Sequence, residues 1–140
     1  MKKITKRALD INLPINRSAF LWGPIKSGKT YWINKHYILM ELKAYQAYRN
    51  PELDIRYWRT SSGFEVDFIL GDMNLVIEVK ASQKIHRGHT KSLKALKEEY
   101  SIGRIVIVSL EKHPRRLDSS IEVLPWQTFL EILWSGGFGV

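Results

Sequence analysis

The stretch that most constrains the fold is a pair of strand-like runs separated by four turn residues. "FEVDFIL", residues 64–70, and "LVIEVKA", residues 75–81, flank the segment Gly71-Asp72-Met73-Asn74. Both runs are rich in β-branched and aromatic residues, and the residues between them favour a short chain reversal. The stretch therefore predicts an antiparallel hairpin.

One register of this hairpin places apolar residues opposite each other along a whole face. It pairs Leu70 with Leu75, Phe68 with Ile77, Val66 with Val79 and Phe64 with Ala81. A slip of one residue would move acids into the apolar layer, so burial favours this register. The other face then carries Asp67 opposite Glu78. Beside that pair, Glu65 lies opposite Lys80.

Two facing carboxylates, with Cβ atoms about 4.5–5.5 Å apart, repel each other unless a positive charge lies between them. Mg²⁺ or Mn²⁺ takes carboxylate oxygens and keeps several waters, one of which can serve as a nucleophile. Lys80 follows Glu78 on the same strand face and can orient that water or stabilise charge on a phosphate. The pattern predicts a metal site at Asp67 and Glu78. It is also typical of a solvated strand face in which a Glu65–Lys80 pair offsets the repulsion.

The remaining patterns place this hairpin in an α/β domain with a mixed central sheet. A run without Gly or Pro predicts one long helix, or two abutting ones, over 30–49, and a strand is expected at 54–60. After the hairpin we expect a helix at 87–101, a buried strand at 104–110, a basic loop at 111–120, a strand at 121–124 and a helix at 126–134. The predicted core is thus a helix, a three-strand antiparallel meander, a helix and a strand.

"FEVDFIL…VIEVKAS" resembles the active-site hairpin of the PD-(D/E)xK nuclease superfamily, whose restriction-endonuclease-like core has this element order. The resemblance implies that Asp67 and Glu78 bind the metal and that Lys80 is catalytic. Glu41, in "MELKAY", matches an additional catalytic acid on the first helix of resolvase-like members. Val66 stands where the classical motif has Pro. The function implied is that of a Mg²⁺- or Mn²⁺-dependent phosphodiesterase acting on DNA.

A closer resemblance covers nearly the whole chain. Residues 17–30 and 40–82 look like the two ends of bacterial and archaeal AAA-type ATPases that carry a nuclease-like C-terminal domain. The Walker B acid, the sensor residues and the arginine finger of such ATPases have no room between these segments. This divides the chain into a truncated P-loop segment, 1–35, and a nuclease-like domain, 36–140. The alternative is a catalytically inactive DNA-binding or protein-interaction module derived from an internally deleted ATPase.

The P-loop pattern itself is complete. "GPIKSGKT", residues 23–30, fits G-x-x-x-x-G-K-[ST] with Gly23, Gly28, Lys29 and Thr30. Backbone N–H groups at such a loop can hold a phosphate, but hydrolysis also needs an acid that holds Mg²⁺ and a group that positions water. ATP hydrolysis is therefore not expected, and ATP or phosphate binding stays open beside the alternative of an inherited relic.

The charge balance favours polyanionic partners. Lys and Arg number 22 against 14 Asp and Glu, which gives a net charge of +8. Basic residues that follow the hairpin predict phosphate contacts with DNA, namely Lys84, Arg87, Lys91 and Lys94, and Arg115 and Arg116 of a later loop extend this set. A solvated helix face is the alternative reading of these residues. His86 and His89 have a spacing seen in zinc sites, but without a Cys or a third His nearby they do not predict one.

The chain has no cysteine, and no window approaches the roughly 18 apolar residues of a membrane span. The basic start lacks the apolar stretch of a signal peptide. These features predict a cytoplasmic protein without membrane contact. A homodimer is compatible with the sequence.

Overall fold

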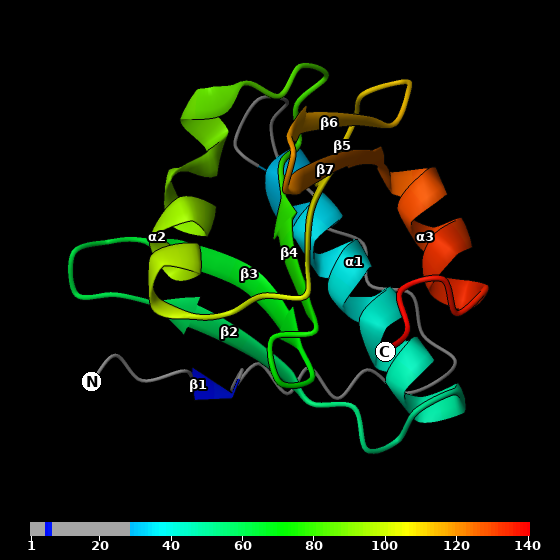
Figure 1. Cartoon of the computed structure of the whole chain (residues 1–140). Coiled ribbons are helices and arrows are strands. Elements are labelled where there is room, and N and C mark those ends of the chain that lie inside the picture. The colour runs from blue at the N-terminus through cyan, green and yellow to red at the C-terminus, as the bar shows by residue number, and fades with distance from the viewer. Residues whose placement is uncertain (1–4, 7–28) are drawn as a thin grey trace.

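A single mixed sheet with helices on both faces forms the body of the molecule (Figure 1). The computed structural model describes residues 5–6 and 29–140. In Figure 1, α2 (Lys91–Glu99) covers one face of the sheet, and α1 (Lys29–Tyr48) and α3 (Trp126–Trp134) lie on the other. The α/β class with a mixed sheet is confirmed. None of the helices in the described part of the chain is long and apolar enough to cross a membrane.

The sheet combines an antiparallel meander with a parallel half. Within the described residues its seven strands are β1 (Thr5–Lys6), β2 (Ile55–Arg59), β3 (Glu65–Leu70), β4 (Leu75–Val79), β5 (Arg104–Ser109), β6 (Arg115–Asp118) and β7 (Ile121–Pro125), in the spatial order β1-β2-β3-β4-β5-β7-β6. Neighbours from β1 to β4 are antiparallel, β4, β5 and β7 are parallel, and β6 closes the far edge antiparallel to β7. Helix, meander, helix and parallel strand follow in the predicted order.

Two hydrophobic cores, one on each face of the sheet, hold the layers together. The α1-side core combines helix residues at helical spacing, Ile38, Leu42 and Tyr45, with Phe129 and Leu133 of α3 and inward residues of β3, β4 and β5. The α2-side core combines Leu93 and Leu96 of α2 with the residues that point to the opposite face of the same strands. The central strands β3, β4 and β5 are therefore buried on both faces, as expected where helices cover both sides.

The hairpin register is as predicted over the half nearest the turn. Phe68 pairs with Ile77, Ile69 with Val76 and Leu70 with Leu75. The turn places Gly71 at φ +63° and Met73 at φ +61°. Glycine adopts such an angle without steric cost, whereas a residue with a side chain does not. Met73 adopts it while its side chain is buried in the α2-side core.

Beyond Phe68 the predicted register fails, because β3 contains a β-bulge. Arg56 of β2 pairs with Ile69 and Trp58 pairs with Val66, so the single residue Tyr57 stands against two residues of β3. A bulge bends its strand and reverses the side-chain alternation beyond it. Val66 consequently packs in the α2-side core with Trp58, and does not face Val79 as predicted. The pairing of Phe64 with Ala81 is also wrong, because Phe64 lies before β3 and the ladder ends at Phe68.

Other boundaries differ in smaller ways. The predicted basic loop contains the edge strand β6, and the helix predicted over 87–101 is a 3₁₀ turn, η1 (Arg87–Thr90), followed by α2. The boundary predicted at residues 35/36 falls inside α1.

Candidate active site

The bulge and the end of the β3–β4 ladder leave an open end of the hairpin, where Asp67 and Glu78 face each other. Here the strands are joined by side chains in place of backbone pairs. The Asp67 backbone N–H donates to Oε2 of Glu78 at 3.3 Å, and the Val79 backbone N–H donates to Oδ2 of Asp67 at 2.9 Å. Each acid thus satisfies a backbone donor of the opposite strand.

Each of these buried carboxylates also has its own lysine. Oδ1 of Asp67 forms an ion pair with Nζ of Lys35, and Oε1 of Glu78 lies 2.5 Å from Nζ of Lys80. Asp67 is 1% exposed and Glu78 is 4% exposed, so unpaired charges here would be costly. The two lysines neutralise the acid pair, and both ammonium groups reach the site from more exposed positions.

Burial and the neighbouring acid change the protonation of Glu78. Desolvation by burial, followed by repulsion from Asp67, raises the pKa of Glu78 from 4.5 to about 7, although Lys80 and Lys35 act in the opposite direction. Desolvation and the neighbouring acid thus outweigh the two lysines at Glu78, and a cation bound at the pair would favour the charged form of its carboxyl group.

Lys35 is the site residue that the sequence analysis missed. It lies on α1 and also contacts Oε1 of Glu65 at 3.3 Å. A signal for it exists in the sequence, because Lys35 precedes Ile38 by three residues and Leu42 by seven and so lies on the buried stripe of the helix. A lysine on such a stripe needs an acidic partner.

The structure brings Asp67, Glu78 and Lys80 together, but it does not add Glu41 to them. Oε2 of Glu41 accepts a hydrogen bond from the Trp134 indole N–H at 2.9 Å, which ties α1 to α3. Glu41 also raises the pKa of Tyr37, after the larger contribution of burial. Glu65 pairs with Lys35 and Arg59 in place of Lys80, because the bulge changes which residues lie across the gap. The first helix therefore contributes a lysine to the site in place of the expected acid.

The donor set suits a divalent cation with few protein ligands. In residues 5–6 and 29–140, no group of three or more histidine, cysteine, aspartate or glutamate side chains is placed to hold a metal ion. Mg²⁺ commonly uses one or two carboxylates and keeps its remaining positions for water and phosphate oxygens. Asp67 and Glu78 fit that pattern if Lys35 and Lys80 release Oδ1 and Oε1, the two oxygens that the ammonium groups hold.

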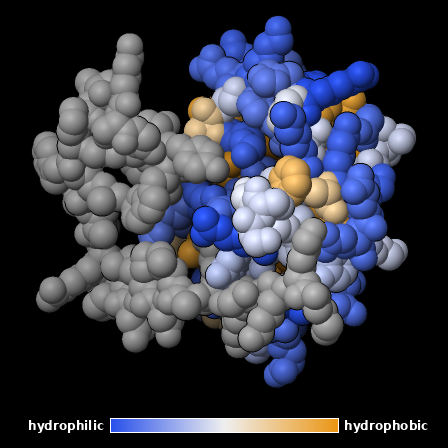
Figure 2. Space-filling view, turned by 90° about the vertical axis from the view of Figure 1, so that its left-hand side faces the viewer, coloured by the Kyte–Doolittle hydropathy of each residue, from blue (hydrophilic) through white to orange (hydrophobic). Residues whose placement is uncertain are grey.

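The basic residues predicted to contact DNA are exposed on the α2 side of the molecule. Lys84 lies in the loop after β4, Arg87 in η1, and Lys91 and Lys94 in α2. The Ser92 hydroxyl accepts the Glu65 backbone N–H at 3.2 Å, so the start of α2 lies beside the open end of the hairpin. Figure 2 looks onto this side and shows a mostly hydrophilic surface wherever described atoms are visible.

The histidines of η1 also lie near the site. The rings of His86 and His89 stack with centroids 3.9 Å apart, and the His89 ring accepts the His86 backbone N–H. Burial, then the charges of His86 and Lys80, lowers the pKa of His89. The charge of Lys80 thus reaches His89, although the contacts of the His89 side chain are with His86.

The P-loop prediction falls largely outside the described residues. Gly23 and Gly28 lie there, whereas Lys29 and Thr30 are the first residues of α1. A helix therefore follows the loop pattern, as predicted. The same helix carries Lys35 to the acid pair.

The comparison with protein families places the chain in one of them. Residues 35–129, more than half of the chain, match the model of a domain of unknown function, DUF4143. The chain belongs to this family. Domains of the family are often found at the C-terminus of AAA-type ATPases, in line with the resemblance seen in the sequence. No curated protein and no solved structure matches the chain.

Proposed function

We propose that the domain is a metal-dependent phosphodiesterase of the PD-(D/E)xK type that acts on DNA. The observation that carries the proposal is the buried pair of Asp67 and Glu78 at the open end of the hairpin, with Lys80 at 2.5 Å from Glu78. Apolar residues at these two positions would stabilise the fold more, because buried ion pairs rarely stabilise a core more than apolar packing does. Two acids at such positions therefore point to a role in binding.

The proposed roles follow from the contacts. Asp67 and Glu78 would hold a Mg²⁺ or Mn²⁺ ion, which would supply an activated water and neutralise charge on the phosphate. Lys80, the residue directly after β4, would donate a hydrogen bond to the attacking water or to a phosphate oxygen. Lys35 pairs with Oδ1 of Asp67 and would have to withdraw for a cation to bind there. The attacking water would form a bond to phosphorus and lose one proton, one phosphorus–oxygen bond would break, and the leaving oxygen would take up one proton.

DNA as the substrate is supported by charge. The net charge of +8 attracts a polyanion, and Arg87 and Lys91 lie on the same side as the start of α2, which contacts β3. Arg115 does not belong to this group, because it is bound to both carboxylate oxygens of Glu111 and to the Ile85 carbonyl. The proposed DNA contacts are therefore Lys84, Arg87, Lys91 and Lys94.

The test is cleavage of plasmid and branched DNA with Mg²⁺ or Mn²⁺ by the wild type and by Lys80→Ala. We expect the variant to lose roughly 100-fold or more of the rate, the usual contribution of a positioned catalytic group. Lys43→Ala is the matched control, because Lys43 is an exposed lysine of α1 that contacts Gln46 and not the acids. Equal rates in the wild type and Lys80→Ala would refute the assigned site.

A second candidate function is a catalytically inactive DNA-binding or protein-interaction module. It is favoured by the same contacts, because all four carboxylate oxygens of Asp67 and Glu78 already have a lysine or a backbone N–H partner. In this case the acids only brace two diverging strands. The wild type would then show no cleavage and no rise in melting temperature with Mn²⁺.

We further infer that the domain derives from a P-loop ATPase and that its own loop does not hydrolyse ATP. The P-loop pattern ends at the first turn of α1, and the acid needed to hold Mg²⁺ at a nucleotide is absent from the sequence between it and the domain. ATP turnover that disappears in Lys29→Ala would contradict this inference.

A further inference from the structure

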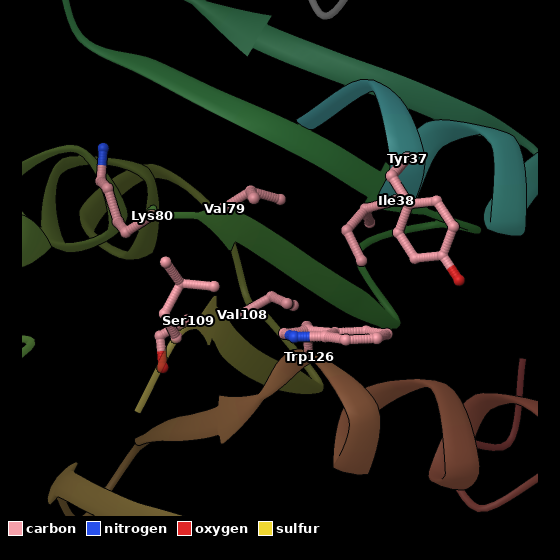
Figure 3. A pocket seen from close by; sticks show the side chains of 8 residues that line it. Tyr37, Ile38, Val79, Lys80, Val108, Ser109 and Trp126 are labelled. Atoms are coloured by element: carbon pink, nitrogen blue, oxygen red, sulfur yellow. The ribbon is translucent and has the colours of Figure 1, made fainter. Parts of the chain in front are cut away.

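A cavity of about 220 Å³ opens beside the acid pair, at the carboxyl ends of the parallel strands β4 and β5 (Figure 3). It lies between α1 and α3 and is lined by Tyr37, Val79, Lys80, Val108, Ser109 and Trp126, among others. Figure 3 shows Tyr37 and the flat indole of Trp126 toward one end, and Lys80 and Ser109 toward the other. The cavity thus has an aromatic end and a polar end.

The cavity and the candidate active site share their walls. Val79 lines the cavity with its side chain, while its backbone N–H donates to Asp67. Lys80 lines the cavity and pairs with Glu78. On the α1 side, Tyr37 follows Lys35, the partner of Asp67, by two residues. A group in the cavity would therefore lie directly beside whatever lies at the acid pair.

The lining selects a flat, largely apolar group next to an anion. Tyr37 and Trp126 meet edge to face with ring centroids 5.8 Å apart, and Ile38, Val79 and Val108 supply aliphatic contacts. The volume is below the roughly 300–1,000 Å³ of sites for drug-sized ligands, so one ring system fits and a larger molecule does not. Aromatic side chains are the usual partners of unstacked bases, because every base has a π-face.

We propose that this cavity receives one unstacked nucleobase of a single strand whose adjacent phosphate lies at Lys80 and the acid pair. The inference rests on the proposed function for the position of that phosphate. It narrows the substrate to DNA that is unpaired at the site, because a base in an intact duplex stays stacked and cannot enter. Regions of branched DNA with unpaired bases would satisfy this requirement.

An aromatic side chain of a partner protein is the competing occupant, and charge argues against it. The side chain of Lys80 lines one end of the cavity, its ammonium group points from there toward Glu78, and the chain carries a net charge of +8. A nucleotide unit provides a flat ring and an anion on one short linkage, which matches both ends. A peptide would need an acidic residue beside its aromatic one.

The test measures binding of a labelled single strand in EDTA, so that no cleavage is needed for a signal. The same strand with abasic sites and the corresponding duplex serve as comparison ligands. We expect the wild type to bind the intact strand about tenfold more tightly than the abasic strand, the effect of one stacked base. The duplex should gain nothing from the cavity.

Two variants locate the effect. Tyr37→Ala and Trp126→Ala should each remove most of the preference for the intact strand over the abasic strand. Tyr37 is 42% exposed, so its replacement leaves the fold intact even if the Trp126 variant does not fold. Met40→Ala is the matched control, because Met40 is 40% exposed, lies one turn further along α1 and does not line the cavity.

The outcomes separate this inference from the proposed function. Equal binding of intact and abasic strands, or a preference for bases that survives in Tyr37→Ala, would refute the nucleobase cavity even if the protein cleaves DNA. Base-dependent binding without any metal-dependent cleavage would refute the proposed phosphodiesterase and leave the cavity assignment standing. If the wild type binds none of the DNA ligands, the cavity assignment is refuted and a protein occupant is favoured.

Discussion

The two ends of the β3–β4 hairpin solve the same pairing problem in different ways. At the closed end, near the turn, three residue pairs from Phe68–Ile77 to Leu70–Leu75 form a regular ladder with every side chain fully buried. At the open end, a few ångströms along the same strands, carboxylates accept the backbone donors that the opposite strand would otherwise satisfy. Packing stabilises one end, and charge is concentrated at the other.

The cause of the difference is that the two strands follow different neighbours. β4 stays paired with β5 as far as Val79, whereas β3 stays paired with β2 through the bulge and reaches Glu65. β3 and β4 separate beyond Phe68 and Ile77, because each strand there stays paired with its other neighbour. Because the ladder supplies the stability, the open end can hold costly groups without unfolding the sheet, which is a common arrangement for functional sites.

The largest expected effect is a loss of stability from a substitution at the closed end of the hairpin. Phe68→Ala removes a fully buried ring from the α1-side core and should lower the free energy of unfolding by about 3–5 kcal/mol. Urea unfolding measures the change. Any Mn²⁺-induced stabilisation should persist in the folded fraction, because the acids are untouched. A loss of less than about 1 kcal/mol would show that the ladder does not carry the stability assigned to it.

The next effect concerns the lysine that α1 supplies to the open end. Lys35→Met leaves Asp67 without its cation and should lower metal-free stability by about 2–3 kcal/mol, because an unpaired buried charge remains. The same variant should respond more strongly to Mn²⁺, since the ion no longer competes with an ammonium group. Thermal melts with and without Mn²⁺ give both numbers. A weaker metal response in the variant would contradict the assignment of Lys35 as a competitor.

A third prediction uses the raised pKa of Glu78. Its folded-state pKa of about 7 exceeds the ordinary 4.5, so the folded chain holds a proton that the unfolded chain has already released between these values. Stability should therefore fall as the pH rises from about 4.5 to about 7, with nothing further lost above that range. Glu78→Gln should remove this fall, which amounts to about 3 kcal/mol for a shift of this size.

Urea unfolding in EDTA at about pH 5 and about pH 8 checks the third prediction. The glutamine oxygen can still accept the Asp67 backbone N–H, so the comparison isolates the charge. If wild type and variant lose stability in parallel over this range, another group causes the pH dependence, and the raised pKa assigned to Glu78 is wrong.

The smallest expected effect on metal-free stability is that of Asp67→Asn. The asparagine oxygen can still accept the Val79 backbone N–H, and the lost pair with Lys35 is offset by relief of the repulsion from Glu78, so the change should stay below about 1 kcal/mol. Stabilisation by Mn²⁺ should disappear; in the wild type it is expected to reach about 2.7 kcal/mol at 100 times the dissociation constant.

Asp72→Asn is the control for this variant, because Asp72 is an exposed acid at the turn of the same hairpin. It should keep the full Mn²⁺ response. Should Asp67→Asn melt much lower with and without Mn²⁺, while the wild type shows no metal shift, the pair would be a structural brace and the second candidate function would stand.

Much of the closed end could be predicted from the sequence, because its information is local. The alternation of apolar residues in two short runs and the glycine at the turn specify the register that is found from Phe68–Ile77 to Leu70–Leu75. The same alternation, together with the spacing of Asp67, Glu78 and Lys80, predicted that these three residues lie close together, as they do. Helical spacing predicted α1, α2 and α3 to within a few residues.

Only the tertiary structure decided four features, namely the bulge, the role of Lys35, the position of Glu41 and the strand β6. Whether β3 follows β2 or β4 past Phe68 depends on the competition between two neighbours, and no pattern within β3 records its outcome. Glu41 binds Trp134, 93 residues away, and β6 forms because β7 offers it an edge. The sequence by itself determined which side chains are apolar and at what period they recur, which is enough for elements and register. Which charged groups meet was settled by contacts between distant segments, because such contacts depend on how all the layers pack at once.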